Sequence, residues 1–158
     1  MASSFVEYKD KYFGLYDTSY ELIMSFVYEA YIQNLKFHKY EWLKEMNDID
    51  FIQRRGGFHG FMGFCFDTHL TNKSRIVVFD DLLNHTKGIL KNLKEITYEH
   101  IQYRQQNDLY NKKAVWHKES FPLSINYYLF ILELISDLIN ERLEEKYLEK
   151  KIHLSMLE

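Results

Sequence analysis

Apolar positions recur at helical spacing along most of the chain, and the residues that break helices gather in two places. The chain has one proline, Pro122, and six glycines, four of which lie between Gly56 and Gly63. Because glycine and proline are the strongest local breakers of helices and strands, the remaining segments are free to form long helices. The pattern predicts an all-α bundle of about four long helices.

The first two predicted helices cover the first third of the chain. Residues 4–16 carry aromatic side chains at helical spacing, which predicts a helix with the rings on one face. These side chains are Phe5, Tyr8, Tyr12 and Tyr16. Thr18 and Glu21 then have the spacing of a capping box. The apolar run behind them predicts a second helix that continues to about Met46.

An irregular segment is expected between the second and third helices. Residues 48–73 are rich in glycine and phenylalanine, with Gly57, Gly60 and Gly63 three residues apart. Either a loop with a short hairpin or a helix with glycines along one face would fit this spacing. The β-branched residues that follow, 76–78, predict either one short strand or the first turn of a helix.

The last two predicted helices contain the most apolar part of the chain. Asp80 or Asp81 can cap a third long helix that runs to about Gln105. Pro122 suits the first turn of the last helix, where its missing N–H leaves no hydrogen bond unmade. This helix is apolar on nearly all sides over 125–139, which predicts the central element of the core. It is expected to continue, more charged, through Glu149.

Length and composition favour one globular domain over residues 1–158. Hydrophobic residues make up 46% of the chain and aromatic residues 17%, enough for one well-filled core. The formal net charge of −3 provides no global attraction to nucleic acid, so no direct nucleic-acid binding is expected. The single cysteine, Cys65, excludes an intramolecular disulfide and fits a reducing, cytoplasmic compartment.

Neither a secretory signal nor a membrane span is expected. The first residues lack a basic segment followed by an apolar run. The most apolar stretch, 123–139, contains Glu133 and Asp137, and two carboxylates are rare in a membrane-spanning helix.

Five carboxylates stand four residues apart near the end of the chain. They are Glu133, Asp137, Glu141, Glu145 and Glu149. On one helix they would form a continuous acidic ridge, in which each like-charge pair costs about 0.2–0.5 kcal/mol. This cost indicates a surface that serves a cationic partner. The alternative is that Lys87, Lys91 and Lys94 of the predicted third helix form internal bridges to the ridge.

Arg54 and His59, with four residues between them, resemble the Arg-x4–6-His pattern of HEPN-type ribonucleases, which are small helical bundles. The resemblance covers six residues. It implies a helix face that presents both side chains to an RNA phosphodiester. Gly56 and Gly57 lie inside the pattern and disfavour that helix by about 1 kcal/mol each. A structural turn with exposed arginines is the alternative.

Cys65, Asp67 and His69 would share one face of an extended strand, with His59 nearby, and all four are residue types that bind metals. Structural zinc sites usually have two clusters of paired ligands, and the sequence has only one. We therefore predict no metal site, and expect a buried free cysteine beside a surface histidine. The sequence also lacks Glu-x-x-His pairs, phosphate-binding glycine loops and Gly-x-Ser-x-Gly. No cofactor and no enzyme activity are predicted.

These patterns favour a non-enzymatic, protein-binding inhibitor, most concretely an immunity protein or antitoxin that neutralises a basic, nuclease-type toxin. The acidic ridge would steer and hold the partner, and Tyr8 and Tyr12 would supply desolvated contacts. A HEPN-like ribonuclease using Arg54 and His59, and a structural subunit that assembles with its own copy, are the alternatives. The sequence leaves the identity of the partner and the oligomeric state open.

Overall fold

The computed structural model describes residues 2–157, which form a mostly helical molecule with one two-stranded sheet. The strands are β1 (Ser3–Tyr8) and β2 (Lys11–Tyr16). The α-helices are α1 (Asp17–Gln33), α2 (Glu41–Ile49), α3 (Phe66–His69), α4 (Lys73–Leu93), α5 (Tyr98–Gln106) and α6 (Ile125–Ile139). Short 3-10 helices are η1 (Leu35–Phe37), η2 (Phe51–Arg55), η3 (Lys118–Ser120), η4 (Glu145–Tyr147) and η5 (Leu154–Leu157). The predicted helical character is confirmed, but all-α and four long helices are not exact, because a small two-stranded sheet and six α-helices are present in residues 2–157.

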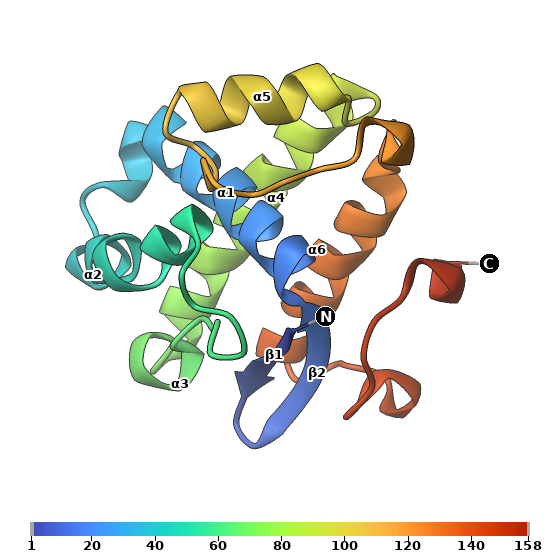
Figure 1. The fold of residues 1–158 in the computed structure, drawn as a ribbon. Helices are drawn as coiled ribbons and strands as arrows, with labels where there is room; N and C mark the ends of the chain where they lie inside the picture. The colour runs from blue at the N-terminus through green and yellow to red at the C-terminus, as the bar shows by residue number, and fades with distance from the viewer. Residues whose placement is uncertain (1, 158) are drawn as a thin grey trace.

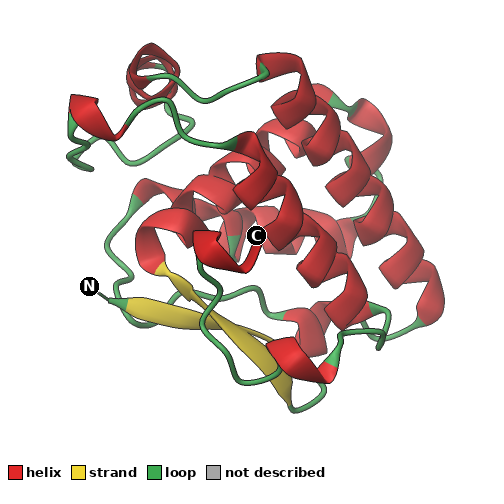
Figure 2. Ribbon diagram, turned by 90° about the vertical axis from the view of Figure 1, so that its right-hand side faces the viewer, coloured by secondary structure: helices red, strands yellow, loops and turns green. Residues whose placement is uncertain are grey.

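The first predicted helix is an antiparallel β-hairpin (Figure 2). Its two turn residues, Lys9 and Asp10, both have positive φ, of 50° and 65°, as a type I′ hairpin turn requires. Val6 and Phe13 pair across the strands and point into the core. Phe5 and Tyr8 lie three residues apart on opposite faces of β1, and the turn separates them from Tyr12 and Tyr16 on β2, so the aromatic row does not form one face.

Helix α1 is the central element of the core (Figure 1). Residues 20–27 are buried without interruption, because α4, α6, η2 and the hairpin all pack around them. The predicted capping box is absent: the helix begins at Asp17, and Glu21 instead contacts Asn111. The predicted helix to Met46 ends at Gln33 and is followed by η1 and α2.

The predicted third helix is two helices. Helix α4 begins seven residues before Asp80, because the side chain of Asn72 caps it by accepting the N–H of Arg75 at 3.0 Å. The β-branched residues 76–78 thus lie in its first turns. The chain turns at Lys94, and α5 starts at a capping box formed by Thr97 and His100.

The last helix is shorter than predicted and is followed by an irregular segment. Helix α6 ends at Ile139, and Glu141 and Glu149 have left-handed φ values of 57° and 61°. Beyond η4 the chain runs along the free edge of β2 (Figure 1). There the N–H of Gly14 donates to Lys150 O at 2.7 Å, and the N–H of Ile152 donates to Gly14 O at 2.9 Å. Within residues 2–157, no helix combines the length and the apolar character needed to cross a membrane.

Candidate functional site

The five carboxylates of the predicted acidic ridge are dispersed over α6 and the irregular segment that follows it. Glu133 and Asp137 lie on α6, Glu141 follows it in a left-handed conformation, Glu145 is in η4, and Glu149 lies at the edge of the hairpin. The chain leaves helical geometry at residue 140 because Asn140 bonds both the Ser136 carbonyl and Asp80. The prediction of one continuous ridge is therefore wrong.

Three of these carboxylates are paired within the molecule. Lys87 of α4 forms an ion pair with Glu133, as the alternative of internal bridges predicted. Arg142 lies 3.5 Å from Asp137, and Lys9 lies 3.5 Å from Glu141. Glu145 and Glu149 are exposed and form no ion pair within residues 2–157.

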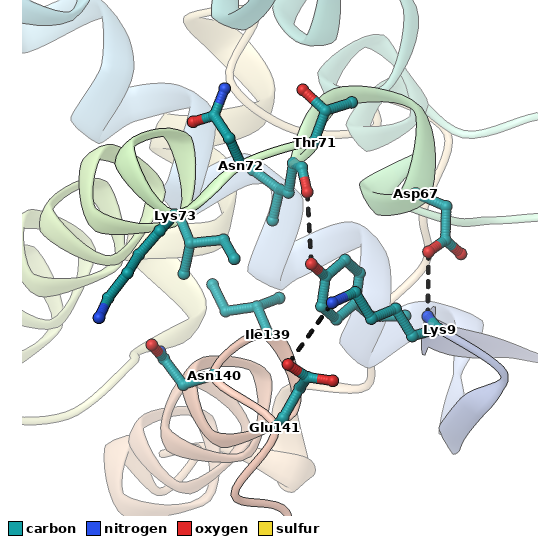
Figure 3. Close-up of a pocket in the computed structure, with 11 residues that line it drawn as sticks. Lys9, Asp67, Thr71, Asn72, Lys73, Ile139, Asn140 and Glu141 are labelled. Atoms are coloured by element: carbon teal, nitrogen blue, oxygen red, sulfur yellow. Dashed lines mark hydrogen bonds and ion pairs between the residues drawn. The ribbon is translucent and has the colours of Figure 1, made fainter.

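Tyr8 and Glu141, both predicted to bind a partner, line one small pocket of about 620 Å³ (Figure 3). The pocket lies between the hairpin turn, the α3–α4 link and the end of α6. Tyr8 is 3% exposed and donates to Leu70 O at 3.3 Å. The N–H of Lys9 donates to Asp67 at 3.0 Å. These contacts attach the hairpin to the helices. Tyr8 therefore stabilises the fold, and its side chain is too buried to form part of a docking surface.

A loop over residues 56–65 has its backbone held by buried side chains from several segments. Five of its N–H groups donate to side-chain oxygens. The pairs are Gly60 to Asp17, Met62 to Ser4, Gly63 to Gln53, Phe64 to Tyr20 and Cys65 to Asp50, at 2.6–3.2 Å. All five acceptors belong to buried residues. Five hydrogen bonds to buried side chains hold the loop backbone in place although it has no regular structure, while the other oxygen of Asp50 has no partner within residues 2–157.

The same loop presents aromatic side chains to water. Phe61 is 88% exposed and Phe58 is 40% exposed. The hydrogen bond from Met62 to Ser4 places the loop beside β1. On that strand Phe5 is 59% exposed, and its ring is tilted against Tyr12 with ring centroids 4.7 Å apart. We refer to Phe5, Tyr12, Phe58 and Phe61 as the aromatic surface. Leaving a phenylalanine in water forgoes about 1.5–3 kcal/mol of burial, and grouped exposed apolar side chains mark interaction sites.

Arg54 and His59 do not share a helix face. Gly56 and Gly57 separate them with φ values of 87° and 92°. Arg54 is 3% exposed, lies 3.5 Å from the centroid of the Tyr28 ring, and donates to the carbonyls of Phe51 and Asp108. The arrangement implied by the HEPN resemblance is therefore absent, and Arg54 joins η2 to the segment after α5.

The Cys65–His69 region also differs from the prediction. Cys65 is exposed and His69 is buried, the reverse of the expected arrangement, and residues 66–69 are helical. Desolvation and the neighbouring Asp50 raise the pKa of the Cys65 thiol to about 11, so it is protonated at neutral pH. In the described part of the chain, no three His, Cys, Asp or Glu side chains gather as metal ligands would.

A second cavity, about 1150 Å³, lies between the start of α1, the glycines of the loop and the segment 108–120. We refer to it as the cleft. Glu21, 2% exposed, lines it and accepts a hydrogen bond from the Asn111 amide at 3.3 Å. Burial raises the pKa of the Glu21 carboxyl, and the Asn111 hydrogen bond offsets only part of this rise. No local sequence pattern indicates the cleft, because Glu21 and Asn111 are ninety residues apart.

Comparisons with protein-family models, with curated protein sequences and with solved structures each find no match for this chain.

Proposed function

We propose that this protein is a non-enzymatic inhibitor that binds a basic protein partner, as immunity proteins and antitoxins do, and that the aromatic surface is where the partner docks. The observation that carries the proposal is the contrast within residues 56–65. The backbone is fixed by five buried acceptors, while Phe58 and Phe61 point into water.

This contrast matters because ordering a loop on binding weakens the complex. Each flexible side chain immobilised at an interface costs about 0.5–1.5 kcal/mol, and a preorganised surface avoids much of the corresponding loop cost. Aromatic residues supply a large contact area with few rotatable bonds, and they dominate the binding energy of many interfaces. A fixed loop with exposed phenylalanines has both properties.

Two exposed carboxylates beside Tyr12 support a basic partner. Glu7 pairs with Tyr12 across the hairpin, and the N–H of Glu149 donates to Tyr12 O at 2.8 Å. Both carboxylates are exposed and form no ion pair within residues 2–157. Arg55, in contrast, is already paired with Asp108 at 2.5 Å. Charges at the rim of an interface steer association and select partners. Of the residues predicted to contact the partner, we therefore retain Tyr12 and Glu149.

The test compares a double substitution on the aromatic surface with a matched one elsewhere. Phe58→Ser with Phe61→Ser removes two exposed rings. Leu35→Ser with Val77→Ser removes two other exposed apolar side chains, which are 78% and 61% exposed. Proteins captured from source cells are identified, and a basic candidate is purified and titrated. We expect the aromatic variant to bind it at least about a hundredfold more weakly, as loss of central interface residues does, and the control to bind normally.

Equal binding by the two variants would contradict the proposal, as would capture of only acidic proteins. The alternative of self-assembly is separated by light scattering of the isolated chain. A dimer that dissociates in the aromatic variant would assign the surface to a second copy and remove the inhibitor role. Activity of the captured protein, measured with and without the chain, tests inhibition itself.

A further inference from the structure

The carboxyl group of Glu21 lines the cleft and has one oxygen available to accept a hydrogen bond from a ligand. One oxygen of Glu21 accepts from Asn111, and the other accepts no hydrogen bond within residues 2–157. The backbone of Gly56 lies against the same amide: a Cβ at this position would stand 2.3 Å from Asn111 Nδ2. A ligand that fills the cleft can offer N–H or O–H donors.

One wall of the cleft is aromatic and held in place. Trp116 lines the cavity, and its indole N–H donates to the hydroxyl of buried Tyr110 at 3.2 Å. The Gln105 amide donates to the carbonyls of Asn111 and Ala114, both at 2.9 Å. These bonds fix the segment that carries the wall. A flat indole face suits a planar ring, because aromatic side chains stack on nucleic-acid bases of any kind.

Cations surround the mouth of the cleft. Lys112, Lys113 and His117 are exposed, line the cavity and form no ion pair in the described part of the chain. Lys113 is oriented by its own N–H, which donates to Asn111 Oδ1 at 2.9 Å. His59 also lines the mouth, 3.6 Å from the carboxylate of Asp17. Lysine side chains without carboxylate partners favour an anionic group such as a phosphate.

We infer that the cleft is a binding site for a purine mononucleotide, with the base between Glu21 and Trp116 and the phosphate at Lys112 and Lys113. A mononucleotide combines the three chemical features that suit the cleft. It has hydrogen-bond donors on the edge of its base, a planar ring and an anionic phosphate. Guanine fits the floor better than adenine, because its N1–H and exocyclic N–H donors are adjacent and can both reach one carboxylate. This site is independent of the aromatic surface and of the proposed partner.

Calorimetric titration of the full chain with GMP, AMP, guanosine and ribose 5-phosphate tests the inference. We expect saturable one-to-one binding of GMP, with AMP, guanosine and ribose 5-phosphate all weaker. Lys112→Ala with Lys113→Ala should weaken GMP at least about tenfold, the effect of losing a charge-assisted hydrogen bond, and leave guanosine unchanged. Glu21→Gln should weaken GMP and guanosine by the same factor.

The matched control is Lys44→Ala with Lys91→Ala, which removes two exposed lysines that do not line the cleft. GMP should bind this control as it binds the unaltered chain. No saturable binding of GMP would overturn the inference. Equal binding of GMP and ribose 5-phosphate would also overturn it, since the base would then contribute nothing. So would equal losses in the control and the Lys112, Lys113 variant, which would indicate non-specific attraction to charge.

Discussion

Gly56 and Gly88 place the same residue type in opposite environments. Gly56 has a φ of 87°, and an added Cβ would meet the Asn111 side chain, whereas Gly88 lies inside α4 with nothing within 4 Å of an added Cβ. Gly88→Ala should raise the free energy of unfolding by about 1 kcal/mol, the helix preference of alanine over glycine. Gly56→Ala should lower it by more than about 1–2 kcal/mol, the left-handed strain alone.

Urea denaturation of the two glycine variants measures both effects against the unaltered chain. If Gly56→Ala were as stable as Gly88→Ala, the close approach of the loop to Asn111 would be contradicted, and with it the closed floor of the cleft.

Glu21 and Asp50 predict a stability that falls as pH rises. Burial is the main cause that raises the pKa of each carboxyl above its ordinary value. Above those ordinary values, the folded chain still holds protons that the unfolded chain has released. The free energy of unfolding therefore decreases as pH rises through the raised folded values. Glu21→Gln removes one of the two contributions.

We expect the decrease in unfolding free energy from about pH 5 to about pH 7 to be smaller in Glu21→Gln than in the unaltered chain. Urea denaturation at the two pH values measures it. An unchanged or steeper decrease would show that Glu21 ionises as freely in the folded protein as in the unfolded chain.

Single residues also show what the sequence could and could not predict. Lys87 was a foreseeable partner for the carboxylates of α6, because only side-chain types and helix order were needed. Asn111 was not foreseeable as the partner of Glu21, since local spacing assigned Glu21 to a capping box. Arg54 is buried because it packs on the Tyr28 ring and donates to the Asp108 carbonyl. Only the tertiary structure brings these two residues to Arg54.

At the scale of elements, Arg104 holds α5 on α1. Its guanidinium donates to Ser25 at 2.7 and 3.1 Å and to Glu29 at 2.5 Å, and lies 3.9 Å from the centroid of the Phe26 ring. Arg104→Ala leaves Glu29, whose side chain is 15% exposed, without its cation. Removing one partner of a buried pair typically costs about 3–5 kcal/mol, so we expect a loss of this size in urea denaturation.

Arg142→Ala is the matched control, because Arg142 also pairs with a carboxylate but its side chain is 62% exposed. An exposed pair contributes about 0–1 kcal/mol, so this variant should be nearly as stable as the unaltered chain. Similar losses in the two variants would refute the role assigned to Arg104.

The elements that the sequence predicted best are those with continuous apolar patterns. The apolar core of α6 was placed correctly over 125–139, and the β-branched residues 76–78 fall in the first turns of α4, one of the two predicted options. The hairpin was missed because its two-residue turn, Lys9 and Asp10, lacks the Asn-Gly or Asp-Gly pair that usually marks such a turn. The break between α4 and α5 was missed because the Thr97–His100 box uses a histidine where glutamate or glutamine is usual.

At the scale of the whole molecule, the five carboxylates are dispersed, while two exposed phenylalanines lie in one fixed loop. The acidic spacing near the end of the chain indicated one charged surface, but the backbone leaves the helix and distributes those carboxylates, three of them into ion pairs. Phe58 and Phe61 are held in position because their loop is fastened by side chains from β1, α1, the Asp50 turn and η2. Such long-range fastening leaves no local pattern for sequence reasoning to detect.

Site-specific photocrosslinking tests the docking surface most directly. A benzoylphenylalanine replaces Phe61 in one sample and exposed Val77 of α4 in the other, and both are irradiated in lysate of the source cells. The account predicts an adduct with one basic protein at position 61, no such adduct at position 77, and its loss when Phe58→Ser is added. Identical adducts at both positions, or none at position 61, would contradict it.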